Sequence, residues 1–157
     1  MVMDEDDEVI YRKYAADLRR LAGMLVGEAN GDDVFVDALL NAVRSVRWAT
    51  LDDDEKRRYL HRTVVNQAHQ WNRSRTRRER REDFVANRSE GGEAAWPDLD
   101  VWHAVATLGT RARAVIFLTY WEDLDGETVA RELGISERSV RRDLARARRE
   151  LRGLIDA

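Results

Sequence analysis

The fold is decided by residues 124–154, whose sequence is LDGETVARELGISERSVRRDLARARRELRGL. This stretch has the pattern of a short helix, a tight turn and a longer second helix. Val129 and Leu133 are four residues apart, as one face of a helix requires. Gly134 is suited to end that helix, and Ser136 is suited to cap the start of the next one. The pattern predicts a helix–turn–helix.

The second helix of this motif carries one apolar stripe, and arginine fills most of its other positions. The apolar residues recur every three or four positions, which predicts a buried face. A helix–turn–helix whose second helix is this basic is typical of a protein that lies on DNA. The alternative is a solvated helix of a bundle. The stripe consists of Val140, Leu144, Ala147, Leu151 and Ile155.

Composition indicates an all-α fold. The 157 residues include one proline and nine glycines, with abundant Ala, Leu, Arg and Glu. There is no cysteine, which excludes disulfides, thiolate metal sites and a thiol nucleophile. The sequence has no run of about eighteen apolar residues, and its start, MVMDEDDEV, is acidic. We therefore expect a cytoplasmic protein with neither a membrane span nor a signal peptide.

The formal net charge of −3 conceals two separate basic blocks. One is RSRTRRERR at residues 73–81, the other is the C-terminal helix, and an acidic stretch lies between them. Two basic surfaces suggest two contacts with one polyanion, while acidic surfaces remain for other partners. The alternative is that arginine-rich helices only keep the chain in solution.

A domain boundary is expected between the basic blocks. The helical pattern ends after Arg81, and Gly91-Gly92 and Trp96-Pro97 are turn or linker signals. We predict two small helical domains, residues 1–82 and 98–157, joined by a flexible linker at 83–97.

Apolar spacing predicts three helices in the first domain, around residues 10–25, 33–46 and 60–71. A break is expected at 27–31, and Asp32 and Asp33 suit the positive N-terminal end of the second helix. After the linker, one helix is expected from Trp102 and another within 110–124, followed by the helix–turn–helix.

Both halves resemble one family, the extracytoplasmic-function (ECF) group of sigma-70 family RNA polymerase sigma factors. Residues 59–78, YLHRTVVNQAHQWNRSRTRR, resemble its regions 2.3 and 2.4, and residues 31–43, GDDVFVDALLNAV, are similar to region 2.2. Residues 108–151 resemble region 4. There are departures: Val36 replaces a usual glutamine, Gly109-Thr110 replace two prolines, Arg138 replaces a glycine, and Arg142-Asp143 replace Ser-Arg. The resemblance covers nearly the whole chain in the correct order.

The resemblance implies a sigma factor that binds core RNA polymerase, recognises the −35 and −10 promoter elements and promotes DNA melting. Its implied partners are the β′ clamp and β flap of the polymerase, promoter DNA and an anti-sigma factor; no cofactor is implied. The helix similar to region 2.2 would bind the β′ clamp through an acidic edge and an apolar stripe. Those polymerase-binding residues are Asp33, Phe35, Asp37, Leu40 and Val43.

The C-terminal helix would lie in the major groove at the −35 element. Arg138, Arg141 and Arg142 are near its start and could reach guanine edges, where each bidentate contact contributes about 1–3 kcal/mol of discrimination. Asp143 could accept a hydrogen bond from a cytosine amino group or orient a neighbouring arginine. The predicted −35 residues are Ser136, Arg138, Ser139, Arg141, Arg142 and Arg146, with Arg146, Arg148 and Arg149 placed for phosphates.

Promoter opening needs groups that hold an unpaired base and single-stranded DNA. The end of the third helix combines amides, arginines and an aromatic ring. Trp71 lies on the apolar stripe with Leu60, Val64 and Ala68, so it is a candidate for the core as much as for base stacking. The predicted −10 residues are Arg62, Asn66, Gln67, Gln70, Trp71, Arg73 and Arg75, with Arg77 and Arg78 on the DNA backbone.

The sequence gives no support to catalysis or metal binding. His61 and His69 are eight residues apart, too far for the paired ligation that a helix makes at four. The run Asp52-Asp53-Asp54 lacks the ligand spacing of a calcium loop. We expect a non-catalytic protein that places the polymerase. Two alternatives are a stand-alone helix–turn–helix regulator, with residues 1–82 as a sensor or dimerisation domain, and a sigma-like interaction protein that does not open DNA.

Overall fold

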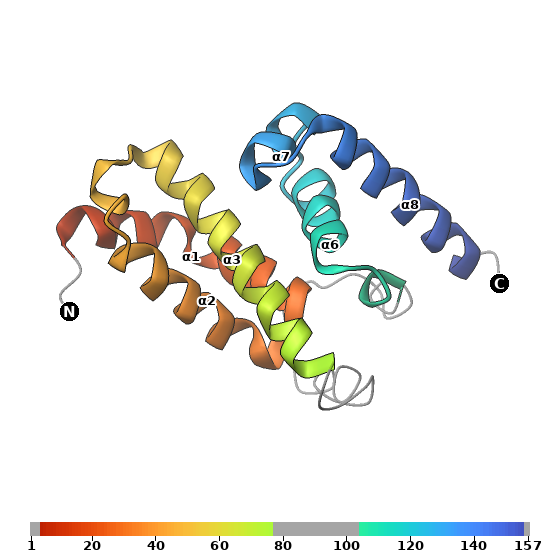
Figure 1. Ribbon diagram of the computed structural model, residues 1–157, viewed down its shortest axis with the longest axis horizontal. Helices are drawn as coiled ribbons and strands as arrows, with labels where there is room; N and C mark the ends of the chain where they lie inside the picture. Colours follow the sequence, from red (N-terminus) through yellow and green to blue (C-terminus); the bar gives the residue numbers. More distant parts are fainter. Residues whose placement is uncertain (1–3, 77–103, 156–157) are drawn as a thin grey trace.

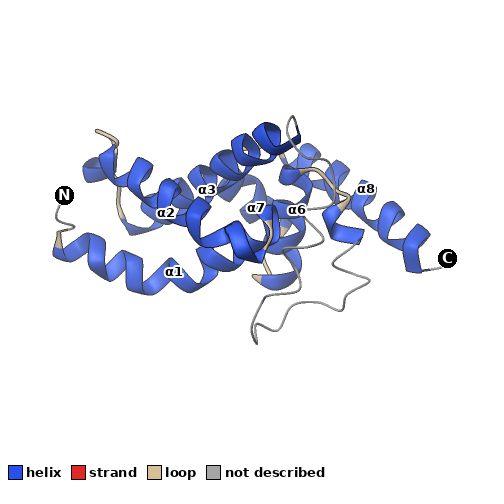
Figure 2. Ribbon diagram, turned by 90° about the horizontal axis from the view of Figure 1, so that it is seen from below, coloured by secondary structure: helices blue, strands red, loops and turns tan. Residues whose placement is uncertain are grey.

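The computed structural model describes residues 4–76 and 104–155. Within these ranges every regular element is helical, as Figure 2 shows, and the predicted all-α class is confirmed. The predicted linker at 83–97 lies outside the described residues, as do Arg77, Arg78 and His103.

The N-terminal half is built from α1 (Glu5–Val26), α2 (Glu28–Arg44), the short 3-10 helix η1 (Trp48–Thr50) and α3 (Asp53–Thr76). Asp4 caps α1 by accepting a 2.8 Å hydrogen bond from the Asp7 backbone N–H. The three long helices lie alongside one another (Figure 1). Their predicted apolar stripes form the core, which includes Ile10, Leu18, Leu21, Leu25, Leu60 and Val64.

The break between α1 and α2 is shorter than the sequence suggested. Gly27 alone separates the helices, with φ at +93°, and α2 already begins at Glu28. The expected break at 27–31 is therefore wrong, and Asp32 and Asp33 lie in the second turn of α2. Gly31 serves helix packing instead, because a Cβ there would lie 2.8 Å from the backbone nitrogen of Gly23 in α1. The two glycines allow the helices to cross closely.

The C-terminal half contains α6 (Thr110–Ile116), the π-helical segment η2 (Phe117–Trp121), α7 (Gly126–Leu133) and α8 (Glu137–Ile155). The helix expected within 110–124 thus ends in a π-helical turn. Asp125 caps α7 by accepting from the Thr128 backbone N–H at 2.8 Å. Together α7 and α8 form the predicted helix–turn–helix.

The two halves are packed against each other. In Figure 1, α7 lies beside the first part of α3, and α6 is close to both α1 and α3. One continuous core cluster joins residues of α1–α3 to residues such as Val115, Leu118 and Val129 from the C-terminal half.

Candidate DNA-binding and polymerase-binding surfaces

Local capping holds the start of α8 in place. Gly134 has φ at +67°, in the left-handed region that glycine tolerates, and it ends α7 as predicted. The Ser136 side-chain oxygen accepts a 3.1 Å hydrogen bond from the Ser139 backbone N–H, so Ser136 caps α8 as predicted. Because these two features fix the turn at both ends, they also fix the direction of α8 relative to α7.

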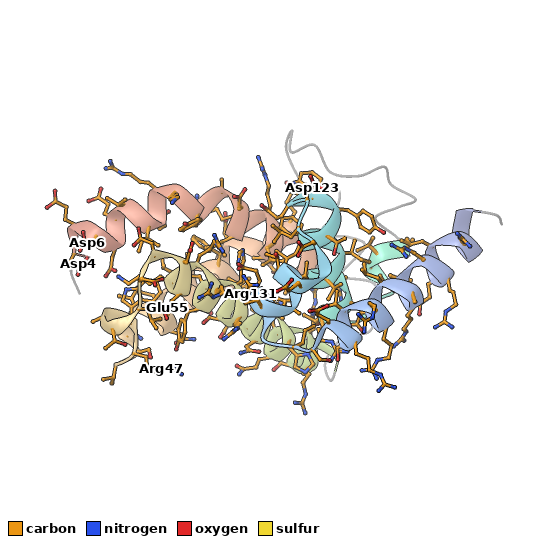
Figure 3. All side chains as sticks on the ribbon, turned by 90° about the horizontal axis from the view of Figure 1, so that it is seen from above. Asp4, Asp6, Arg47, Glu55, Asp123 and Arg131 are labelled. Atoms are coloured by element: carbon orange, nitrogen blue, oxygen red, sulfur yellow. The ribbon has the colours of Figure 1, made fainter. Side chains whose placement is uncertain are left out.

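The exposed face of α8 is basic. Val140 and Ala147 are buried, and the helix turns its arginines outward (Figure 3). Arg146 forms an ion pair with Glu150 at 3.1 Å, and Arg148 donates to the Tyr120 hydroxyl at 3.2 Å. These exposed interactions are weak, so the two arginines can exchange them for contacts with DNA phosphates. The exposed arginines of the predicted DNA surface are Arg138, Arg141, Arg142, Arg146, Arg148 and Arg149.

Asp143 does not take either of the roles that the sequence suggested. It is buried and accepts two hydrogen bonds from Arg111 of α6, at 2.7 Å from Nε and 3.0 Å from Nη2. The hydrogen bond that Arg111 donates to this carboxylate raises the pKa of Arg111. The expectation that Asp143 contacts cytosine or orients Arg142 or Arg146 is therefore corrected: the residue fastens α8 to α6.

The residues predicted for the −10 element all lie on α3, but they differ in exposure. Asn66, Gln70 and Arg73 are exposed, and Gln67 is half-buried and accepts a hydrogen bond from the Asn41 side chain at 3.2 Å. Arg62 is also exposed, but its guanidinium donates to the backbone carbonyl of Arg131 at the end of α7, at 2.7 Å. The side of α3 that carries Arg62 therefore touches the helix–turn–helix.

Trp71 packs against the core with part of its ring and remains half-buried. Its indole Nε1 is buried and has no hydrogen-bond partner. Nη1 of Arg75 is also buried and also has no partner. A buried donor without a partner costs about 1–3 kcal/mol. Both orphan donors lie in the last turns of α3, where the sequence predicts contact with DNA, so the core and base-contact interpretations of Trp71 are compatible.

The predicted polymerase-binding residues of α2 divide into two groups. Asp33 and Asp37 are exposed, and Leu40 and Val43 are half-buried. Phe35 is only 1% exposed and belongs to the core, where its ring packs near Tyr11. Its assignment to the polymerase surface is therefore corrected, because a buried ring is not available to a partner.

Val36 extends the exposed face of α2. It is 45% exposed and lies between Asp33 and Leu40 at helical spacing. Sequence reasoning noted Val36 only as a departure from a family pattern. Val36 places one exposed apolar side chain between the carboxylates of Asp33 and Asp37 on this helix.

A buried ionic cluster joins the two halves, and sequence reasoning missed it. Glu132 of α7 is 1% exposed. It accepts a hydrogen bond from Arg57 at 2.6 Å and lies 2.7 Å from His61 Nδ1, both from α3. Burial by itself raises the pKa of Glu132, but the hydrogen bonds from His61 and Arg57 outweigh it, and the net pKa is lowered.

A second buried contact involves the end of α1. Arg113 of α6 donates to the Leu25 carbonyl at 2.7 Å and to the Leu108 carbonyl at 3.0 Å. Burial lowers the pKa of Arg113 to about 10, which leaves it cationic at neutral pH. Asn72 of α3 donates to the same Leu25 carbonyl and to Thr110. No spacing in the sequence identifies these residues, since the partners are far apart along the chain.

Within the described residues, no three histidine, aspartate or glutamate side chains gather as metal ligands would. The same residues contain no helix that is both long and apolar enough to cross a membrane. His61 is engaged with Glu132, and His69 is exposed.

Comparison with known proteins gives consistent results for both halves. Residues 98–151 match the family model "Sigma-70, region 4". The chain is 28% identical over 151 residues to an RNA polymerase sigma-E factor of Streptomyces antibioticus, covering 94% of this chain and 83% of that protein. It is 26% identical over 157 residues to an RNA polymerase sigma-E factor of Streptomyces coelicolor, covering 94% and 84%.

The fold is also found among solved structures. The sigma factor RpoE of Bartonella quintana, determined in complex with the anti-sigma factor NepR, superposes with a TM-score of 0.71 at 18% identity. The match covers 98% of this chain and 99% of that chain. It therefore includes the N-terminal helices as well as the helix–turn–helix.

Proposed function

We propose that this chain, which belongs to the ECF group of the sigma-70 family of RNA polymerase sigma factors, binds core polymerase and places it on promoters by contacts at the −35 and −10 elements. The observation that carries the proposal is the pair of arginine-bearing helices, α3 and α8, one in each half of the chain. The chain itself performs no chemistry in this proposal, because phosphoryl transfer belongs to the polymerase. Its place of action is the cytoplasm, where polymerase and chromosome meet.

The −35 element is the proposed target of α8. The capped N-terminus of α8 presents Arg138, Arg141 and Arg142 on an exposed face, in the position from which a recognition helix reads base edges. Arg148 and Arg149 lie further along the helix, where phosphate contacts fix orientation without reading sequence. Asp143 contributes by holding α8 on α6.

The −10 element is the proposed target of α3. Asn66 and Gln70 are exposed amides that can bond to the edge of an unpaired base, and Arg73 adds positive charge beside them. The buried, unpartnered Nε1 of Trp71 suggests that the last turns of α3 adjust when DNA binds. We propose that these residues stabilise the melted strand.

Core polymerase is the proposed partner of α2. The carboxylates of Asp33 and Asp37 flank the exposed apolar side chain of Val36, a combination that suits a basic partner with an apolar centre, which we take to be the β′ clamp. The helix–turn–helix half would make a second contact with the β flap. An anti-sigma factor is a further proposed partner, because the related RpoE was solved with one.

The test is transcription by core polymerase reconstituted with this chain on fragmented genomic DNA. We expect transcripts with defined 5′ ends that appear only when the chain is added. Replacing Asp33 and Asp37 together with lysine should abolish both these transcripts and co-purification with core polymerase, because the like charges then repel. The exposed pair Glu5 and Asp6, reversed in the same way, is the control.

The alternatives predict other results. A stand-alone regulator would bind duplex DNA without co-purifying with the polymerase. An interaction protein that does not open DNA would co-purify and yield no transcript. Permanganate reactivity of thymines near the start site identifies this last case, because it detects melted DNA directly and would be absent there.

A further inference from the structure

The amide of Gln67 has a preferred orientation, in contrast to the other amides assigned to the −10 element. Its oxygen Oε1 accepts a 3.2 Å hydrogen bond from Nδ2 of Asn41, where α2 and α3 lie side by side (Figure 1). Asn66 and Gln70 are exposed and make no side-chain hydrogen bond to the residues that the structure describes. Their amides can therefore turn either way, while that of Gln67 is held by its neighbour.

This hydrogen bond decides which end of the Gln67 amide faces a bound molecule. A side-chain amide has a carbonyl oxygen that accepts hydrogen bonds and an NH2 group that donates them. Because Asn41 donates to the oxygen, the NH2 group is the end that remains for another partner. Gln67 is half-buried and Asn41 is exposed, so the pair lies at the protein surface rather than in the core.

Unpaired bases differ in the group that they offer to such a donor. Thymine has the acceptor oxygen O4 at the ring position where cytosine has an amino group, which donates. Guanine O6 and adenine N6 differ in the same way. An outward NH2 group therefore makes a hydrogen bond with a keto base, thymine or guanine. In an amino base, cytosine or adenine, it faces a second donor.

We propose that Asn41 is a positioning residue for the −10 contact, because it holds the NH2 group of Gln67 outward and so makes the chain favour a keto base at the unpaired position beside Gln67. The inference rests on the proposed function, in which α3 holds the melted strand. It adds to that function the class of base that Gln67 selects. Asn41 acts through Gln67 and belongs to α2 rather than to the helix that contacts the strand.

The test compares the binding of oligo(dT) and oligo(dC), each of about 16 nucleotides. A homopolymer has the same base at every position, so the register of the strand on α3 does not affect the result. The full chain is assembled with core polymerase, and binding by core polymerase alone is subtracted. By fluorescence anisotropy we expect the wild type to bind oligo(dT) about 2- to 10-fold more tightly than oligo(dC), the range of one net hydrogen bond.

Two substitutions should reverse this preference from opposite sides of the pair. The carboxylate of Asn41→Asp only accepts, so Gln67 turns its NH2 group toward it and presents Oε1 outward. Gln67→Glu has only oxygens to present, while Asn41 still donates to one of them. Both variants should bind oligo(dC) more tightly than oligo(dT). Asn41→Ala should bring the ratio of the two affinities close to one, because the Gln67 amide is then free to turn.

Arg44→Gln is the matched control for charge. Arg44 is exposed three residues further along α2, and its replacement makes the chain more negative by the same single charge as Asn41→Asp and Gln67→Glu. This variant should weaken the binding of both strands alike and keep the wild-type ratio, because charge acts on phosphates and carries no information about the base. Circular dichroism checks that each variant keeps its helices.

The outcomes separate this inference from the proposed function. If the wild type bound both strands equally, or if Asn41→Asp and Gln67→Glu kept the wild-type ratio, the positioning role of Asn41 would be overturned and α3 would remain the strand-binding helix. A change of ratio in Arg44→Gln as large as that in Asn41→Asp would also overturn it, since charge alone would then explain the effect. If Asn66→Ala and Arg73→Ala both bound the strands as tightly as the wild type, the proposed −10 contact and this inference would fail together.

Discussion

At the residue scale, Asp143 illustrates how one side chain can influence the proposed DNA contact of α8 while it faces the protein interior. An acidic residue in a recognition helix is unfavourable beside phosphates, and the structure resolves this by turning it inward onto Arg111. The pair is bidentate, which fixes the rotation of α8 about its axis as well as its distance from α6. The arginines on the opposite side of α8 are oriented through this contact.

Replacing Asp143 with asparagine should lower the free energy of unfolding by about 1 kcal/mol, a modest amount because Arg111 is partly exposed to solvent. We also expect weaker discrimination among −35 sequences, since α8 can then rotate. Urea denaturation measures the first effect and competition binding the second. Glu150→Gln, which removes an exposed pair with Arg146, should change neither quantity, and an equal effect there would contradict the positioning role.

At the element scale, the turn between α7 and α8 determines the direction of α8, the proposed recognition helix. Its geometry depends on a left-handed residue at Gly134 followed by the Ser136 cap. Any residue with a Cβ pays for left-handed geometry and, here, also meets the Arg62 side chain. The turn is therefore constrained both by local backbone preference and by the neighbouring helix.

Gly134→Ala should destabilise the protein by about 1–2 kcal/mol, the usual cost of left-handed geometry for a residue with a side chain. Gly153→Ala is the matched control. Gly153 is in α8, has nothing within 4 Å of a built Cβ, and should gain up to about 1 kcal/mol because alanine favours helix. Thermal unfolding of both variants checks the prediction, which fails if the two substitutions shift the midpoint in the same direction.

The two ends of α8 should contribute differently to DNA binding. Arg141→Ala, near the capped end, should remove about 1–3 kcal/mol of discrimination between −35 sequences. Arg149→Ala, further along the helix, should weaken binding to all DNA sequences alike. It should also flatten the slope of log binding constant against log salt concentration by about 0.9, as expected for a lost phosphate contact. Filter binding at several salt concentrations distinguishes them. If the Arg141→Ala variant discriminated between −35 sequences as well as the wild type, α8 would have to bind DNA with other residues facing the bases.

At the scale of the whole molecule, the Glu132 cluster makes the association of the two halves depend on pH. The carboxyl pKa is lowered in the folded chain relative to its ordinary value of 4.5. A lowered acid pKa contributes stability that is complete above the ordinary value and is lost as pH falls through the lowered one. The contact should therefore hold at neutral pH and loosen in acid.

We expect the unfolding midpoint of the wild type to fall more steeply than that of Glu132→Gln between about pH 5 and pH 3. The difference between the two profiles isolates Glu132 from the other carboxylates, which titrate in both proteins. Differential scanning calorimetry over this range is the measurement. Parallel profiles would mean that the buried carboxylate is not charged in the folded state.

The sequence by itself determined the helices, their buried stripes and the helix–turn–helix with its two caps. These features depend on interactions within about four residues, so spacing alone reveals them: Gly134 and Ser136 are recognisable without any knowledge of the fold. The basic character of α3 and α8 is equally local, because it is a property of which residues are present. The same reasoning placed Asn66, Gln70 and Arg141 on exposed helix faces.

Only the tertiary structure decided which of the candidate residues are committed to the fold. Phe35 lies inside the core rather than on α2's outer face, Asp143 binds Arg111, and Gly31 packs on Gly23 rather than ending a helix. Glu132 finds its partners more than seventy positions earlier in the chain. Contacts of this kind arise when helices that are remote in sequence pack together, and no periodicity within one helix encodes the side chains it will meet on another. For that reason the pairing of α7 with Arg62 on α3 became apparent only from the packed structure.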